Sequence, residues 1–211
     1  MAGSFIVVEG ADGVGKTTLA SRLADRLRQE GLEVIEVREP GGTPVAELAR
    51  AAVLDPALDP SPVAELFLIL AARADLVSRI IQPALAAGRI VVGDRYDLST
   101  RAYQIAGRGL PDEPVTAANN LATGGLVPDL TLVLDAPGAI SSARQASQGK
   151  QPDRIENAAS DVQQRIAQAF RKASGPGVVH IDATGSPEEV ERAVWEHVWG
   201  RVTGTQQESV G

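Results

Sequence analysis

The stretch from Gly10 to Thr17, Gly-Ala-Asp-Gly-Val-Gly-Lys-Thr, constrains the fold of this chain more than any other feature. It has the spacing glycine, four residues, glycine, lysine and a hydroxyl residue, and it lies between an apolar run at 5–8 and a helical pattern. Glycines let backbone N–H groups approach an anion, and the start of a helix adds a positive dipole end. We therefore predict a strand, a phosphate-binding loop and a helix. The expected nucleotide-binding residues are Gly10, Ala11, Asp12, Gly13, Val14, Gly15, Lys16, Thr17 and Thr18.

Two side chains of this loop and a distant aspartate form a candidate metal and phosphate site. Lys16 would reach the outer phosphates of a nucleotide, and the Thr17 hydroxyl would hold Mg²⁺. The apolar run at 90–93 ends in Asp94-Arg95. An aspartate there can help to hold the same ion, so Thr17 and Asp94 are the expected metal residues. Arg95 can bind a second phosphate through its planar fork, although Asp94-Arg95 alone would also fit a surface ion pair.

Short apolar runs alternate with helical patterns along the chain. Unbroken apolar strands are typical of sheets that are covered on both faces. We therefore predict right-handed βαβ units in one three-layer α/β/α domain of the P-loop NTPase type, spanning residues 1–203, with a frayed tail at 204–211. The five parallel strands are expected at Phe5–Glu9, Glu33–Val37, Ile90–Gly93, Leu130–Asp135 and Val178–Ile181.

The composition limits the possible partners and compartments. Lys and Arg number 20 and Asp and Glu number 27, so the formal net charge of −7 argues against a general nucleic-acid-binding surface. The chain has no cysteine, which excludes disulfides, thiolate metal sites and a cysteine nucleophile. The longest apolar region, at about 64–92, is interrupted by charged residues and a proline, and no secretory signal is visible. We therefore expect a cytoplasmic protein without a membrane span.

One charged residue lies on the apolar face of the helix predicted at about 62–87. At 100° per residue, Arg73 falls near the centre of the apolar stripe, where a charge has to be paired or has to point into a polar cavity. It could be structural, either snorkelling or paired with a carboxylate such as Glu9. It could equally face a ligand, with Ile69 one turn earlier lining the same spot. The stripe consists of Leu66, Leu70, Val77, Ile80 and Ala84.

Two further loops carry basic residues. Arg38 begins the segment Arg-Glu-Pro-Gly-Gly after the second predicted strand. Loops at the carboxyl ends of parallel strands face the ligand crevice, so Arg38 is expected on the phosphate-binding side, with a cis peptide bond before Pro40. The segment at about 144–155 contains Arg144, Lys150 and Arg154 and is a candidate lid over a triphosphate. An ordinary solvated loop would have the same composition.

Together these motifs resemble the thymidylate kinase family, whose members move the γ-phosphate of ATP onto dTMP. The resemblance runs over about residues 4–200. The segment Gly93–Gln104 is its most specific part, because many NTPases share the P-loop. The resemblance implies a kinase that uses ATP, Mg²⁺ and dTMP, and that forms a homodimer through its helices. The other matching segments are Val8–Thr18, Arg38–Gly42, Ala71–Arg73, Gly107–Gly109, Pro128–Asp135 and Asp153–Glu156.

The resemblance also implies a role for individual residues. Asp12 would accept a hydrogen bond from the 3′-hydroxyl of the acceptor, and Arg38 and Arg95 would hold its phosphate. Arg73 would donate to a thymine carbonyl. The implied catalytic residues are Lys16, Arg95 and the lid residue Arg154, which would reach the ATP phosphates. The implied substrate-binding residues are Asp12, Arg38, Ile69, Arg73, Arg95, Ser99, Thr100, Tyr103 and Gln104, of which Thr100 and Gln104 would meet the base edge and Tyr103 the sugar.

Two departures from the family pattern leave alternatives open. Ile69 stands where the family usually has a phenylalanine that stacks on thymine, a contact worth about 1–3 kcal/mol. Another pyrimidine monophosphate such as dUMP is therefore an alternative acceptor. Gly13 stands where some members carry an arginine, so a lid residue among Arg144, Lys150 and Arg154 would act instead, as in the bacterial type. A GTP-binding switch protein is the alternative from another class, but it would need an Asn-Lys-x-Asp motif, which the sequence lacks.

Overall fold

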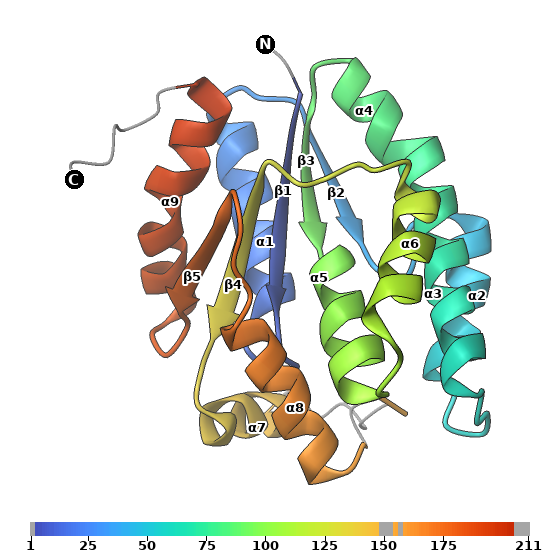
Figure 1. Cartoon of the computed structure of the whole chain (residues 1–211). Coiled ribbons are helices and arrows are strands. Elements are labelled where there is room, and N and C mark those ends of the chain that lie inside the picture. The colour runs from blue at the N-terminus through green and yellow to red at the C-terminus, as the bar shows by residue number, and fades with distance from the viewer. Residues whose placement is uncertain (1–2, 148–153, 156–157, 205–211) are drawn as a thin grey trace.

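Five parallel strands form the centre of the computed structural model, which describes residues 3–147, 154–155 and 158–204 (Figure 1). Their order in the sheet is β2-β3-β1-β4-β5. Each predicted strand is confirmed, with ends that differ by at most one residue. The strands are β1 (Ser4–Gly10), β2 (Val34–Arg38), β3 (Ile90–Asp94), β4 (Leu130–Asp135) and β5 (Val178–Asp182).

Helices cover both faces of the sheet, which confirms the three-layer prediction (Figure 1). Side chains alternate along β1, so that Ile6 and Val8 pack under α1 (Lys16–Gln29) and α9 (Pro187–Thr203). Phe5 and Val7 pack on the opposite face, under the long helix that begins at Pro62. The remaining helical elements are α2 (Pro44–Leu54), α5 (Asp97–Thr100), η2 (Arg101–Gly107), α6 (Asp112–Thr123), α7 (Gly138–Ser147) and α8 (Ser160–Arg171).

The long helix predicted at 62–87 is present but is not α-helical throughout. It consists of α3 (Pro62–Leu76), a π-helical segment η1 (Val77–Ile81) and α4 (Gln82–Ala86). Pro83 has no N–H to donate to the carbonyl of Arg79, and a wider turn accommodates that loss. The extra residue per turn shifts the buried face, so Ile81 is fully buried where the regular period predicted Ile80.

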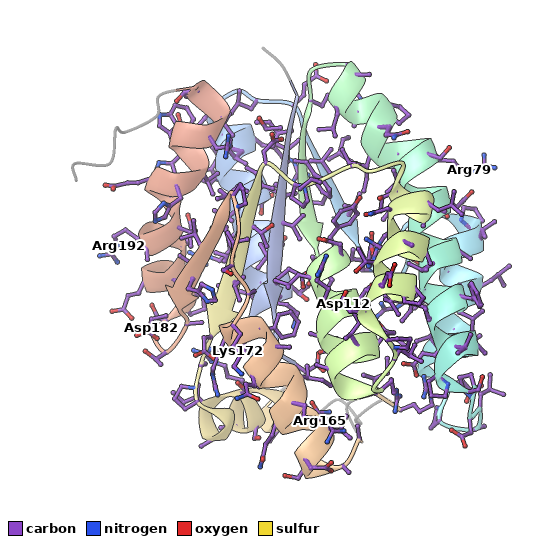
Figure 2. All side chains as sticks on the ribbon, viewed as in Figure 1. Arg79, Asp112, Arg165, Lys172, Asp182 and Arg192 are labelled. Carbon is purple, nitrogen blue, oxygen red and sulfur yellow. The ribbon has the colours of Figure 1, made fainter. Side chains whose placement is uncertain are left out.

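Charged side chains at the periphery face away from the sheet, as Arg79, Asp182 and Arg192 show (Figure 2). Helix α9 begins with a capping box between Ser186 and Glu189, and it ends at Thr203 before Gly204 in the left-handed conformation. Most of the predicted tail and the central part of the predicted lid, including Lys150, lie outside the described residues. No helix in the described part of the chain combines the length and apolar character of a membrane span.

Candidate active site

The P-loop connects the carboxyl end of β1 to the start of α1, as predicted. Gly10, Gly13 and Gly15 have φ values of 139°, 78° and 103°, a region that side-chain-bearing residues rarely adopt. A Cβ at Gly13 would lie 2.5 Å from the carbonyl oxygen of Ser141, because α7 packs directly on the loop. The loop lines one end of a cavity of about 540 Å³.

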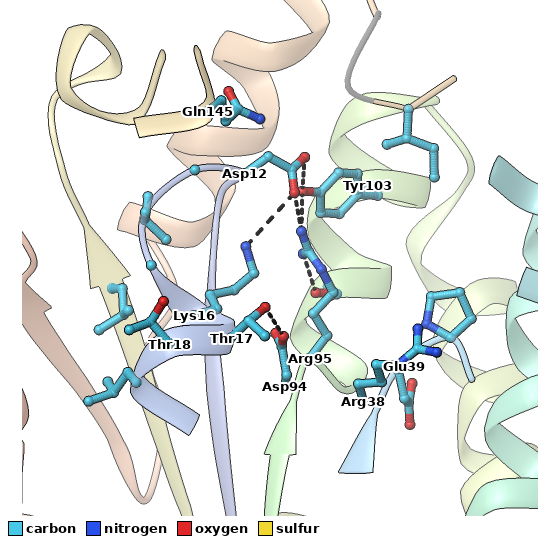
Figure 3. Close-up of a pocket in the computed structure, with 18 of the residues that line it drawn as sticks. Asp12, Lys16, Thr17, Thr18, Arg38, Glu39, Asp94, Arg95, Tyr103 and Gln145 are labelled. Carbon is cyan, nitrogen blue, oxygen red and sulfur yellow. Dashed lines mark hydrogen bonds and ion pairs between the residues drawn. The ribbon is translucent and has the colours of Figure 1, made fainter. Parts of the chain in front are cut away.

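Lys16 is buried at the floor of this cavity. Its Nζ donates to the carbonyl oxygen of Ala11 at 2.6 Å. Figure 3 shows its contact with Asp12, whose Oδ1 lies 3.8 Å away. Burial, with a smaller contribution from the nearby cation Arg95, lowers the pKa of Lys16 to about 8. An incoming polyphosphate would stabilise the charged form of this lysine.

Thr17 and Asp94 lie side by side although 77 positions separate them in the sequence. The pairing of β1 with β3 brings Asp94 level with Val8, close to the start of α1. Thr17 Oγ1 donates to Asp94 Oδ2 at 2.5 Å, while Asp94 Oδ1 is buried with no hydrogen-bond partner among the described residues. Mg²⁺ typically takes one or two protein oxygens and leaves its other positions to water and phosphate, so this pair fits the ion.

Arg95 links the P-loop to the opposite wall of the cavity (Figure 3). It pairs with Asp12, its Nη2 donates to Tyr103 Oη at 3.0 Å, and its Nη1 donates to Ser99 Oγ at 3.1 Å. Tyr103 Oη in turn donates to Asp12 Oδ2 at 2.7 Å. Arg95 has a positive φ of 75°, which is uncommon for a residue with a side chain and occurs where the surroundings fix the backbone.

Glu9 fixes the segment 96–99, which follows Arg95, through hydrogen bonds. It is fully buried and accepts hydrogen bonds from the backbone N–H groups of Tyr96 and Ser99 at 2.8 and 3.1 Å and from Ser99 Oγ at 2.6 Å. Burial raises the pKa of Glu9 to about 7. The expectation that Glu9 could pair with Arg73 is wrong, since Glu9 lies under Ser99 and Tyr96 instead.

Arg73 forms its buried ion pair with Glu39. Glu39 Oε2 lies 2.6 Å from Arg73 Nε, and the bond before Pro40 is cis, as predicted. The pairing explains why a charge is tolerated on the apolar face. Every nitrogen of the Arg73 guanidinium already has an acceptor. The carbonyl of a nucleotide base would therefore have to share a nitrogen with one of these acceptors or displace it. The other acceptors are Thr100 Oγ1 at 2.7 Å, Asn119 Oδ1 at 2.5 Å and the Tyr96 carbonyl oxygen at 2.8 Å.

The predicted substrate residues converge on the same cavity. Helix α5 continues directly into the π-helical segment η2, and Thr100, Tyr103 and Gln104 of these two elements line the cavity. Arg38 lines it as well and pairs with Glu47 at 3.0 Å. The full set of predicted substrate residues in the lining is Asp12, Arg38, Ile69, Arg73, Arg95, Ser99, Thr100, Tyr103 and Gln104.

Comparisons with known proteins establish the family of the chain. The family model for thymidylate kinase matches residues 8–194. The chain belongs to the thymidylate kinase family. It is 46% identical to a thymidylate kinase of a Synechococcus strain over 94% of this chain and 95% of the relative. It is 43% identical to that of Deinococcus radiodurans, with 93% and 96% covered, and 47% identical to that of Cereibacter sphaeroides, with 90% and 91% covered.

The two described arginines of the predicted lid in this thymidylate kinase family member lie on different sides of the cavity. Arg144, on α7, donates to the carbonyl oxygens of Val14 at 3.2 Å and Ala183 at 2.8 Å, beside the P-loop. Arg154 donates to the Val53 carbonyl oxygen at 2.9 Å and pairs with Glu65. In this conformation Arg154 is therefore held on the α2 and α3 side, and its action at ATP stays a prediction.

Several residues of the site were not predicted from the sequence. Glu39 and Asn119 surround Arg73, Glu65 lies behind Gln104, and Arg50 lines the cavity while donating to the Pro40 carbonyl oxygen at 2.8 Å. Glu39 directly follows the predicted site residue Arg38, and this position is the sequence signal that could have identified it. Asn119 carries no comparable signal, because it lies within an ordinary amphipathic helix.

Proposed function

We propose that this chain transfers the γ-phosphate of ATP to dTMP, giving ADP and dTDP in the cytoplasm. The membership in the thymidylate kinase family supports the reaction. The observation that carries the proposal is the position of two groups of cations in one cavity. Lys16 belongs to the P-loop and Arg95 pairs with the P-loop residue Asp12, while Arg38 and Arg73 line other parts of the same cavity.

In the proposed mechanism the chain positions two anions and neutralises charge. No strong base is needed, because a phosphate monoester oxygen is already anionic near pH 7. The P-loop and Lys16 would hold the ATP phosphates, and Arg95 would orient the acceptor phosphate for in-line attack. Mg²⁺, held by Thr17 and Asp94, would supply further neutralisation of the phosphate oxygens when bound. Arg154 would complete the charge neutralisation from the lid.

An assay of ADP release with a panel of nucleoside monophosphates tests this proposal. We expect dTMP to give the highest kcat/KM, and we expect Lys16→Ala and Arg95→Ala to lower kcat by at least about 100-fold while the circular dichroism spectrum is kept. Turnover of either variant near the wild-type rate would contradict the assigned roles. ATP binding without turnover of any monophosphate would contradict the reaction itself.

A second acceptor, dUMP, is supported by one specific observation. Ile69, at 8% exposed, lines the cavity at the position where the family usually stacks a phenylalanine on the base. A smaller aliphatic side chain makes less contact with the thymine ring and therefore discriminates less between thymine and uracil. The same panel separates the two, since comparable kcat/KM values for dUMP and dTMP would favour the broader acceptor range.

We also propose that the chain forms a homodimer through α2 and α3. Leu48 and Phe67 are 75% and 61% exposed, and Val45 and Val63 are each 49% exposed on the same two helices. Helices α2 and α3 pack against each other, and several exposed apolar side chains on neighbouring helices are typical of protein interfaces. Light scattering coupled to size-exclusion chromatography should give twice the chain mass of 22.0 kDa, and Phe67→Glu should shift it to the monomer.

A further inference from the structure

Glu65 is a buried carboxylate that none of the expected roles explains. It lies in the first turn of α3, is 1% exposed, and receives donors from separate segments of the chain. Gln104 Nε2 donates to Glu65 Oε1 at 3.0 Å, and Arg108 donates to the same carboxylate through Nε at 3.0 Å and Nη2 at 2.8 Å. Arg154 pairs with Glu65 as well.

The surroundings keep this carboxylate ionised. Burial alone would raise the pKa of Glu65, but the hydrogen bonds from Arg108 and Arg154 outweigh that effect and hold the pKa below its usual value. An ionised carboxylate can only accept hydrogen bonds. The side chain of Gln104 must therefore direct its NH₂ group towards Glu65.

This constraint determines which atom Gln104 presents to the cavity. Gln104 is 1% exposed and lines the cavity between Thr100 and Tyr103. With its nitrogen held by Glu65, the carboxamide oxygen has no hydrogen-bond partner among the residues that the structure describes. An amide without such a neighbour could rotate by 180° and present a donor instead. The cavity therefore offers an acceptor at this point.

We propose that Glu65 determines which pyrimidine the cavity accepts, by fixing the carboxamide of Gln104 with its oxygen towards the base. This inference rests on the proposed function. A 4-oxopyrimidine such as thymine or uracil carries an N3–H donor that matches the oxygen. A 4-aminopyrimidine such as cytosine carries an N3 acceptor, which would face the Gln104 oxygen without a proton between them. Glu65 is thus a positioning residue that acts through Gln104.

The variant Glu65→Gln tests the assignment because a carboxamide can donate as well as accept. Gln104 can then adopt either orientation. We expect the ratio of dTMP to dCMP affinity, measured by calorimetry, and the ratio of their kcat/KM values to fall by at least about tenfold. Glu65→Gln also removes the ion-pair partner of Arg154, which would alter kcat for both acceptors alike. The difference between dTMP and dCMP should therefore appear in their KM values, since the N3 contact does not alter during phosphoryl transfer. If Glu65→Gln does not fold, Glu65→Asp withdraws the carboxylate from Gln104 by one methylene, and a ratio lowered by at least about threefold is expected.

Two comparisons make the result decisive. Arg108→Gln removes another donor to the same carboxylate but leaves the Gln104 contact, so its dTMP to dCMP ratio should stay within about twofold of wild type. In a Gln104→Leu background, Glu65→Gln should not change the ratio further. An unchanged ratio in folded Glu65→Gln, an equal fall in Arg108→Gln, or a further fall in the Gln104→Leu background would overturn the inference. Absence of dTMP turnover by the wild type would contradict the proposed function alone, because the affinity ratios would still report on Glu65.

Discussion

Lys16 is buried and lies near the cation Arg95, and its burial above all predicts a pH dependence of ATP binding. Burial holds the pKa of Lys16 near 8 in the ligand-free protein, so part of the population is neutral at pH 8.5. ATP would raise that pKa, because its phosphates stabilise the ammonium. Binding at pH 8.5 should therefore take up protons, and ATP affinity should fall as the pH rises above 8.

Calorimetry of ATP binding in two buffers with different ionisation enthalpies measures this proton uptake. The variant Lys16→Met is the control, because it removes the titrating group and should abolish the dependence on the buffer. Equal apparent enthalpies for the wild type in both buffers at pH 8.5 would show that Lys16 is fully charged before ATP arrives.

Gly13 and Gly15 allow backbone strain to be separated from steric conflict in the P-loop. Both have positive φ, at 78° and 103°. A Cβ at Gly13 would lie 2.5 Å from the Ser141 carbonyl oxygen, whereas a Cβ at Gly15 would meet nothing within 4 Å. Gly15→Ala should therefore lower the free energy of unfolding by about 1 kcal/mol through strain alone, and Gly13→Ala by about 2–4 kcal/mol. Urea denaturation measures both, and equal losses would show that α7 moves away from the loop at little cost.

Among single residues, the sequence predicted those that belong to a motif of fixed spacing. It missed the residues whose side chains hold the motif residues in place. Lys16 and Thr17 follow from a fixed spacing of glycines, and Asp94-Arg95 from the end of an apolar strand. Glu9, Glu39 and Asn119 act by holding other side chains. Their partners are distant in the sequence, so only the packed chain shows that Glu9 lies under Ser99 and Glu39 under Arg73.

Among the elements, α3 and the loop after β2 are joined by the buried pair of Arg73 and Glu39. Removing one member leaves an uncompensated buried charge, so Arg73→Met or Glu39→Met should each lower the free energy of unfolding by about 3–5 kcal/mol. The double variant Arg73→Met/Glu39→Met leaves no such charge and should be less destabilised than either single variant. Urea denaturation of the three variants checks this order. Additive losses in the double variant would mean that the two side chains are not coupled.

The elements also show where periodicity is informative and where it fails. Strand positions were predictable to within one residue because a strand of a parallel sheet is a short apolar run between polar loops. Within the long helix the predicted stripe failed at Ile80, where Ile81 is buried instead, because the π-helical segment Val77–Ile81 changes the angle per residue, whereas Val77 and Ala84 are buried as predicted. A proline at position 83 hints at an irregularity, but its effect on burial depends on how the neighbouring turns adjust.

For the whole molecule, the central claim is that ATP and dTMP lie end to end in one cavity. A single ligand that joins adenosine to thymidine through five phosphates should then bind at least about 100-fold more tightly than ATP or dTMP alone, since the second contact becomes intramolecular. At 100 times its dissociation constant it would add about 2.7 kcal/mol to the free energy of unfolding, or roughly 5–10 °C in melting temperature for a chain of this size.

Calorimetry and thermal melting test this gain, and Arg73 provides the control. Arg73 lines the cavity, is expected to hold the base, and forms its hydrogen bonds with Glu39, Tyr96, Thr100 and Asn119, none of which belongs to the P-loop. Arg73→Met should therefore reduce the affinity for the linked ligand and for dTMP while the affinity for ATP stays within about twofold of wild type. A linked ligand that binds no more tightly than ATP would place the two nucleotides in separate sites. Loss of ATP affinity in Arg73→Met would instead show that the arginine serves the donor end of the cavity.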